Sequence, residues 1–366
     1  MNINKLGYFL LMIIFVSLSS CTMKITAPDK PDIIVVREPS QGAVDFSQEL
    51  TVMPPIQDMS GFTTGAIVTN TIGGLDFDMV YVAGGFIFPT GFSDNGSASV
   101  ADAYWIAKTE VTYELWYKVY QWAVDPARGP NVYHFANVGA QGSNGVFGAP
   151  PIQPMAGQPV TKINQRDAMV WANAITEYYN AEHGTNYNCV CEIGGTPIRD
   201  SNTTVMCDNA TPDPGRKGFR LFTGNEWELA ARYKGSDSSN NAKELPVGSG
   251  IYWTPGNYVS GATDYAIDLS GNPNPNLDPT KATTWYGANS GGATHVVGSK
   301  NANALGLSDM SGNVTEWLFG NVQSNALARG GSWYYNIVYL PVGTLFYTNS
   351  LASSTIFGFR LAKTAD

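Results

Sequence analysis

Few residues of this chain have the types and spacing that catalysis requires. Glu226 and Glu228 form a carboxylate pair, but residues two apart on a helix do not face each other. Thr223 and Glu226 fit a capping box, S/T-x-x-E, which gives Glu226 a structural role. The chain has neither a P-loop nor a G-x-G-x-x-G fingerprint. Its histidines lie in expected loops or at a helix end, without a recognisable Ser or Asp partner: His134, His183 and His295. We therefore expect no catalytic residues.

Cys21 follows a segment typical of a bacterial lipoprotein signal. Lys5 supplies a positive n-region, and the apolar run Leu6–Val16 is too short for a comfortable membrane span. The ending Leu18-Ser19-Ser20-Cys21 resembles a lipobox, whose Cys becomes the lipidated first residue of the mature protein. We expect residues 1–20 to be a signal peptide and Cys21 to anchor a bacterial lipoprotein in the outer membrane, exposed at the surface. The alternative is an ordinary secretion signal with an incidental Cys.

Three further thiols remain: Cys189, Cys191 and Cys207. Outside the cytoplasm, three thiols favour one disulfide and one spare Cys, with Cys207 as the shared partner of either neighbour. The C-x-C pair is too weak a signal for zinc without a second pair or a suitable His. We expect a disulfide-stapled surface insertion and leave the pairing open.

Composition describes a loop-rich globular protein. The 366 residues include 12% aromatic residues, 39 Gly and only 14% charged residues. The net charge of −9 argues against nucleic acid as a partner, because nucleic acid binding needs a basic face. Pro28, Pro31 and Pro39 stand among mixed charges with little periodicity. We expect a tether and N-terminal extension over 21–75 and a globular domain over 76–366.

The hydrophobic pattern of the domain predicts an α+β fold with two main helices, short strands and much irregular chain. Thr112 is the expected N-cap of one helix, and Asn164 of the other, which Gly184 ends. Long loops are expected over 129–160 and 235–300. The expected strands and main helices are Gly65–Thr71, Phe77–Val82, Tyr104–Lys108, Tyr113–Val124 and Gln165–Glu182.

The order of motifs along the domain resembles the formylglycine-generating enzyme, or sulfatase-modifying factor, family. The matching segments are Phe77–Gly84, Lys108–Thr112, Pro159-Val160, Phe219–Arg232, Gly306–Trp317, Arg329–Trp333 and Gly358–Leu361. The resemblance implies a variant of the C-type lectin fold. Oxidase members of that family bind copper through two cysteines shortly after Gly-Gly-Ser, and those positions are occupied here by Tyr335 and Leu340. Neither residue supplies the soft thiolate that copper(I) needs, so we expect no copper and no enzyme activity. The alternative is a related oxidase with relocated active residues.

The same resemblance implies a structural calcium ion in Gly306–Trp317. Its ligands would be the side chains of Asp309 and Glu316 and the backbone oxygens of Gly312 and Val314, since calcium binds several oxygens. The alternative is that Asp309 caps a tight turn and Glu316 pairs with an Arg. A second family calcium site, near Asn257 and Asn289, does not transfer with confidence across the long insertion.

The stretch 334–357 has the composition of a binding surface. It has no charged residue, no Gln and no Met, but many Tyr, Phe, Thr, Ser and Asn. It lies between Gly-Gly-Ser-Trp and Gly-Phe-Arg near the C-terminus, and there it resembles the variable region of proteins diversified by retroelements. A spirochaetal variable lipoprotein of this class matches the lipobox, the fold and the segment together. The expected ligand-binding residues are Tyr334, Tyr335, Asn336, Val338, Tyr339, Thr344, Phe346, Tyr347, Thr348 and Asn349.

The sequence thus predicts a monomeric surface lipoprotein for recognition or adhesion. Its partner would be a protein or glycan ligand, and its only membrane contact the N-terminal lipid. Val342, Ile356 and Phe359 are expected in the core, as strand alternation requires. Ordinary closing strands over 334–357, or a structural lipoprotein on a degenerate enzyme fold, are the alternatives.

Overall fold

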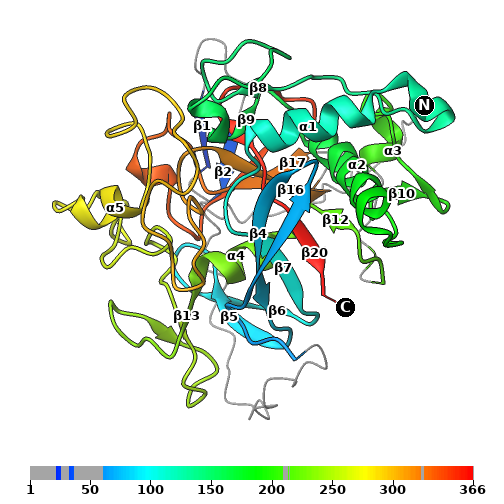
Figure 1. Ribbon diagram of the computed structural model, residues 1–366. Helices are drawn as coiled ribbons and strands as arrows, with labels where there is room; N and C mark the ends of the chain where they lie inside the picture. Colours follow the sequence, from blue (N-terminus) through cyan, green and yellow to red (C-terminus); the bar gives the residue numbers. More distant parts are fainter. Residues whose placement is uncertain are drawn as a thin grey trace, which may run out of the picture.

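Two larger sheets, four smaller ones and five α-helices form the fold of the described residues (Figure 1). The computed structural model describes residues 61–208, 213, 215–322 and 325–365, together with the backbone of two strands at Thr22–Ile25 and Ile33–Val36. The predicted signal peptide and Cys21 lie outside these residues. The α-helices are α1 (Tyr113–Ala123), α2 (Gln165–His183), α3 (Thr204–Asp208), α4 (Gly224–Arg232) and α5 (Asp278–Thr283). Short 3-10 helices are η1 (Pro126–Asn131), η2 (Met155–Gly157) and η3 (Ile337–Tyr339).

The first sheet has five strands, ordered β12-β20-β7-β4-β3. Its strands are β12 (Phe219–Arg220), β20 (Ala362–Thr364), β7 (Tyr104–Ala107), β4 (Leu75–Val82) and β3 (Ile67–Ile72). The predicted domain start at residue 76 falls inside β4, and β3 pairs with β4 along its whole length. The domain therefore begins before residue 76.

The second sheet has six strands, ordered β1-β2-β18-β17-β16-β19. They are β1 (Thr22–Ile25), β2 (Ile33–Val36), β18 (Leu345–Asn349), β17 (Asn325–Arg329), β16 (Thr315–Val322) and β19 (Phe357–Gly358). Two strands of this sheet come from the predicted tether, and one from the predicted variable segment. The prediction of a tether does not include these two strands. They pair with each other and, through β2, with β18, which lies about 300 residues further along the chain.

The smaller sheets close the surrounding loops. One has three strands: β13 (Tyr233–Gly235), β15 (Tyr252–Trp253) and β14 (Lys243–Glu244). The others are pairs: β5 (Phe86–Thr90) with β6 (Gly96–Val100), β8 (Ala140–Gln141) with β9 (Val160–Thr161), and β10 (Glu192–Ile193) with β11 (Thr196–Pro197). Long loops around α5 lie on the side of the molecule opposite α2 (Figure 1).

Both main helices begin and end as their capping residues predict. The Thr112 side chain accepts a hydrogen bond from the Leu115 amide, and Asn164 forms a reciprocal capping box with Asp167. Gly184 ends α2 in the left-handed conformation that Gly adopts without strain. The helices pack through the stacked rings of Trp116 and Trp171, whose centroids are 5.5 Å apart. This contact holds the two helices together, and both rings also meet the ring of Phe359 edge to face.

A buried ion pair joins the chain before the segment 334–357 to the chain after it. Arg360 is fully buried and donates to Glu316 Oε1 from Nε (2.9 Å) and Nη2 (2.8 Å). Arg360 also donates to the carbonyls of Ala107 and Ser308. Trp227 Nε1 donates to Glu316 Oε2 at 2.7 Å, so both carboxylate oxygens have partners.

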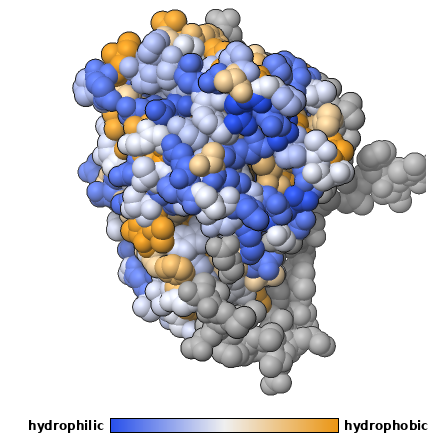
Figure 2. All heavy atoms as spheres, turned by 45° about the vertical axis from the view of Figure 1, so that its right-hand side comes forward, coloured by the Kyte–Doolittle hydropathy of each residue, from blue (hydrophilic) through white to orange (hydrophobic). Residues whose placement is uncertain are grey.

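The outer surface is mixed. On the face in Figure 2, hydrophobic residues form separate patches between larger hydrophilic areas. Among the described helices, none is long and apolar enough to cross a membrane.

Replacing Arg360 should destabilise the fold strongly. In Arg360→Leu, Glu316 stays buried without its cation, which costs ~3–5 kcal/mol of unfolding free energy. The exposed pair Lys281–Asp278 supplies a matched control, since Lys281→Ala should change stability by less than ~0.5 kcal/mol. Urea unfolding of the two variants measures both. Equal effects would contradict the role given to the buried pair.

Candidate functional site: the segment 334–357

The segment begins at a tight turn. Gly330 and Gly331 have φ of 92° and 69°, a region that side chains disfavour. A Cβ on Gly331 would lie 2.7 Å from Leu340 Cδ2 and 3.0 Å from the Tyr339 carbonyl oxygen. Glycine at 331 therefore lets the start of the segment pack directly against η3.

Side chains outside the segment hold its middle by main-chain atoms. Arg329 Nη1 donates to the carbonyls of Val342 (3.1 Å) and Thr344 (3.2 Å). The Ser311 hydroxyl donates to the carbonyl of Leu340 at 3.0 Å. Carbonyl groups are present whatever the residue type, so these contacts do not depend on the side chains of the segment.

The two ends of the segment are held in the same way. Trp333 Nε1 donates to the carbonyl of Thr355 at 2.9 Å, which brings the beginning and end of the segment together. The Ser290 hydroxyl donates to the Trp333 carbonyl, and the Gly287 amide donates to the Tyr335 carbonyl. The loop around Ser290 belongs to the predicted long loop 235–300, which therefore lies against the start of the segment.

Five of the ten predicted ligand-binding residues are exposed or half-buried. Tyr334 is 41% exposed, Asn336 and Asn349 are exposed, and Val338 and Tyr347 are half-buried. Asn336 caps η3 by accepting from the Val338 amide, and Asn349 accepts from the Leu351 amide. These five residues are the predicted ones whose side chains reach the solvent.

The other five predicted residues are buried, and the structure corrects their assignment: Tyr335, Tyr339, Thr344, Phe346 and Thr348. Tyr335 stacks on Phe346 inside the core, with centroids 5.6 Å apart. Alternation along β18 explains the rest, because Phe346 and Thr348 point inward while Leu345, Tyr347 and Asn349 are more exposed.

The prediction also omitted Leu345, which is half-buried, and Leu351, which is 49% exposed. Strand alternation in the sequence could have found Leu345. The predicted core residues are confirmed as buried: Val342, Ile356 and Phe359.

The two positions at which oxidase members of the family carry cysteines are buried here. Tyr335 is 3% exposed and Leu340 fully buried, and burial raises the pKa of the Tyr335 hydroxyl. The three described cysteines are buried free thiols, in place of the expected disulfide: Cys189 and Cys191 lie just before β10, and Cys207 lies in α3. Burial raises the pKa of Cys189 and of Cys207 to about 12, and that of Cys191 well above its usual range. A thiol with such a pKa forms little of the thiolate that nucleophilic chemistry requires.

The two carboxylates predicted to bind calcium have hydrogen-bond partners within the protein. Glu316 is paired with Arg360 and Trp227, while Asp309 Oδ2 accepts the Gly298 amide at 2.7 Å. Asp309 Oδ1 is buried without a hydrogen-bond partner in the described part of the chain, and burial raises the pKa of this carboxyl to about 6. Among the described residues, no group of three or more His, Cys, Asp or Glu is arranged to hold a metal. The ion pair of Glu316 agrees with the alternative to calcium, in which Glu316 pairs with an Arg.

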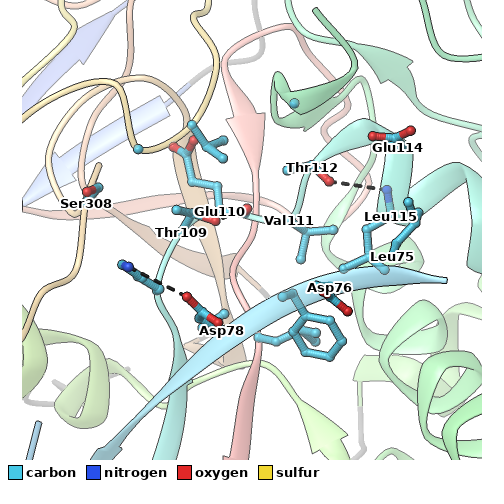
Figure 3. A pocket seen from close by; sticks show the side chains of 17 residues that line it. Leu75, Asp76, Asp78, Thr109, Glu110, Val111, Thr112, Glu114, Leu115 and Ser308 are labelled. Atoms are coloured by element: carbon cyan, nitrogen blue, oxygen red, sulfur yellow. Dashed lines mark hydrogen bonds and ion pairs between the residues drawn. The ribbon is translucent and has the colours of Figure 1, made fainter. Parts of the chain in front are cut away.

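An open pocket of about 500 Å³ lies away from the segment, between β4, β7 and the start of α1 (Figure 3). Asp78, Glu110 and Glu114 surround it, and Lys108 pairs with Asp78 at 3.6 Å. Glu110 is committed to the fold, because its oxygens accept from the Val314 amide and the Asn313 side chain. The pocket contains none of the ten predicted residues.

The fold and the motif frame define a known class of protein. The domain model of the sulfatase-modifying factor enzyme 1-like family matches residues 74–365, and the chain belongs to this family. The predicted formylglycine-generating-enzyme type of C-type lectin-like fold is confirmed.

Two solved structures and one further protein are similar to this chain. The chain is similar to the structure of Treponema denticola variable protein 1, with 27% identity and a TM-score of 0.55, over 82% of this chain and 99% of that one. The structure of CarF is similar at 25% identity and a TM-score of 0.55, over 79% of this chain and 99% of that one. The chaperone protein LppX of Paenibacillus barcinonensis is 26% identical over 204 residues, which are 49% of this chain. The match spans 60% of that relative's length.

Calcium should not stabilise the folded protein. Because Glu316 already has two partners, we expect the melting temperature in EDTA and in excess Ca²⁺ to agree within about 1 °C. Differential scanning calorimetry at both conditions measures this. A melting temperature that EDTA lowers by several degrees, and that Ca²⁺ restores, would show that the predicted ion binds after all.

Proposed function

We propose that this chain is a surface-displayed recognition protein whose diversified segment 334–357 binds a ligand through its outer side chains. The observation that carries the proposal is the way the segment is held. Arg329, Ser311, Trp333 and the Gly287 amide donate hydrogen bonds to carbonyl groups of the segment, so its outer residues can change while these contacts remain.

The outer side chains suit recognition. Tyrosine supplies a large contact area with few rotatable bonds, and asparagine adapts its hydrogen bonding to different ligands. Tyr334 and Asn336 lie at the start of the face, and Tyr347, Asn349 and Leu351 continue it along and beyond β18. The ligand we propose is a protein or a glycan, because neither class needs a basic surface.

The similarity to Treponema denticola variable protein 1 supports variation as the purpose of the segment. By the sequence resemblance, a retroelement would introduce the variation. Lipidation of Cys21 would attach the monomeric protein to the outer membrane, with the domain at the cell surface.

Catalysis is not part of the proposal. Copper chemistry in this family type would need thiolates where Tyr335 and Leu340 stand, and the described thiols are buried with raised pKa values. Tyr335 is instead part of the core that supports the recognition face.

Two matched libraries test this division of the segment. Randomising the outer positions Tyr334, Asn336, Tyr347, Asn349 and Leu351 should leave most variants folded, because surface substitutions usually change stability by less than ~0.5 kcal/mol. Randomising the buried positions Tyr335, Tyr339, Thr344, Phe346 and Thr348 should unfold most variants, since core truncations cost ~2–5 kcal/mol.

Display on yeast, with resistance to protease as the folding readout, compares the two libraries. Selecting the outer library on a panel of purified proteins and immobilised glycans should then enrich binders with different outer residues. Equal loss of folding in both libraries, or no enrichment on any member of the panel, would contradict the proposal.

A further inference from the structure

The outer edge of β18 is paired with the chain's own N-terminal region. One edge of β18 pairs with β17, and the other pairs with β2 in antiparallel orientation. In this second pairing, Leu345 is opposite Val36, Phe346 is opposite Val35, and Tyr347 is opposite Ile34. β2 forms a hairpin with β1, which becomes the last strand of the sheet. Figure 1 shows β1 and β2 as the two dark blue strands.

An edge strand of changing sequence is a hazard for a protein. Unpaired N–H and C=O groups on an edge invite pairing with other chains, and apolar side chains increase that tendency. Every diversified version of Leu345–Asn349 would expose such an edge if nothing covered it. Strand pairing removes the hazard through main-chain hydrogen bonds, which form with any residue except proline in the partner.

The sequence of the N-terminal hairpin suits this role. β2 is Ile33-Ile34-Val35-Val36, four β-branched residues with high strand propensity. The new edge strand, β1, carries Lys24, and a charged residue on an edge opposes further pairing. The hairpin thus replaces a variable edge by a constant, charged one.

We propose that the docked segment Ile33–Val36 closes the outer edge of β18 against strand addition by other chains, whatever residues β18 carries. A ligand of the recognition face would then contact the side chains of the segment. It could not pair with β18 as an added strand, because β2 already occupies that edge. The pairing of β2 with β18 does not depend on the proposed function. The benefit of that pairing for a diversified strand rests on the proposed function.

The docked hairpin also brings the beginning of β1 close to the segment. Thr22 is opposite Val36, and Val36 is opposite Leu345. Neighbouring strands are ~4.8 Å apart, so Thr22 lies about 10 Å from Leu345.

A designed cross-link tests the register in the full-length chain. We expect Ile34→Cys/Tyr347→Cys to form an intramolecular disulfide under mild oxidation, because directly opposed residues meet the distance that a disulfide needs. The control Ile34→Cys/Asn349→Cys shifts one partner by two residues and should form little. Peptide mass spectrometry identifies the bond, and non-reducing electrophoresis separates intramolecular from intermolecular products.

Hydrogen exchange provides a second measurement without new thiols. Ile34→Pro/Val35→Pro removes two neighbouring amide donors, one of which faces β18. Peptides covering Leu345–Asn349 should then exchange about tenfold faster, while Gln41→Pro/Gly42→Pro, outside the strand, should leave them unchanged. Faster exchange together with the in-register disulfide supports the proposal. Unchanged exchange, or the absence of that disulfide, overturns it, and a disulfide between two chains overturns the chain's own segment as occupant.

Discussion

The contact between Arg360 and Glu316 is the constraint on which the rest of the structure depends. It joins the constant segments before and after 334–357, which are 44 residues apart in sequence. Trp227 brings α4 to the same carboxylate, and Arg360 extends the contact to the carbonyls of Ala107 and Ser308. A buried pair of charges is stable only when its remaining hydrogen-bonding groups have partners, and here they do. The positions of the two ends of the segment 334–357 are therefore set by residues outside it, and not by its own side chains.

From this frame the segment is held by its main chain. Arg329 and Ser311 bind carbonyls in its middle, Trp333 joins its ends, and β2 pairs with the edge of β18. Side chains of the segment then divide between a buried set, which completes the core, and an outer set that is available to vary. Under the proposed function, the buried set would supply stability and the outer set recognition, within one stretch of sequence.

Much of this architecture is predictable from sequence, because its signals are local. Thr112, Asn164 and Gly184 mark the ends of the helices, and the family motifs fix the order of the elements. The alternation of residues along β18 also predicts which of them are buried and which are outer. Composition without this alternation places Phe346 and Thr348 among the ligand-binding residues. A binding surface therefore cannot be identified from residue types without the strand periodicity.

Other features depend on partners that are distant in sequence. Glu316 beside a tight turn has the local appearance of a calcium ligand, and only the fold shows that Arg360 occupies its carboxylate. In the same way, Ile33–Val36 has strand propensity but no local partner, so its pairing with β18 could not be foreseen. Long-range contacts, not weak propensities, account for both differences.

The central claim is that variation is confined to a segment held by a constant frame. The most direct measurement is to sequence this gene in many clones of the source organism. The account predicts that amino-acid differences concentrate between Trp333 and Phe357, while Glu316, Arg329 and Arg360 stay unchanged. Differences spread evenly over the domain, or a constant segment 334–357, would contradict it.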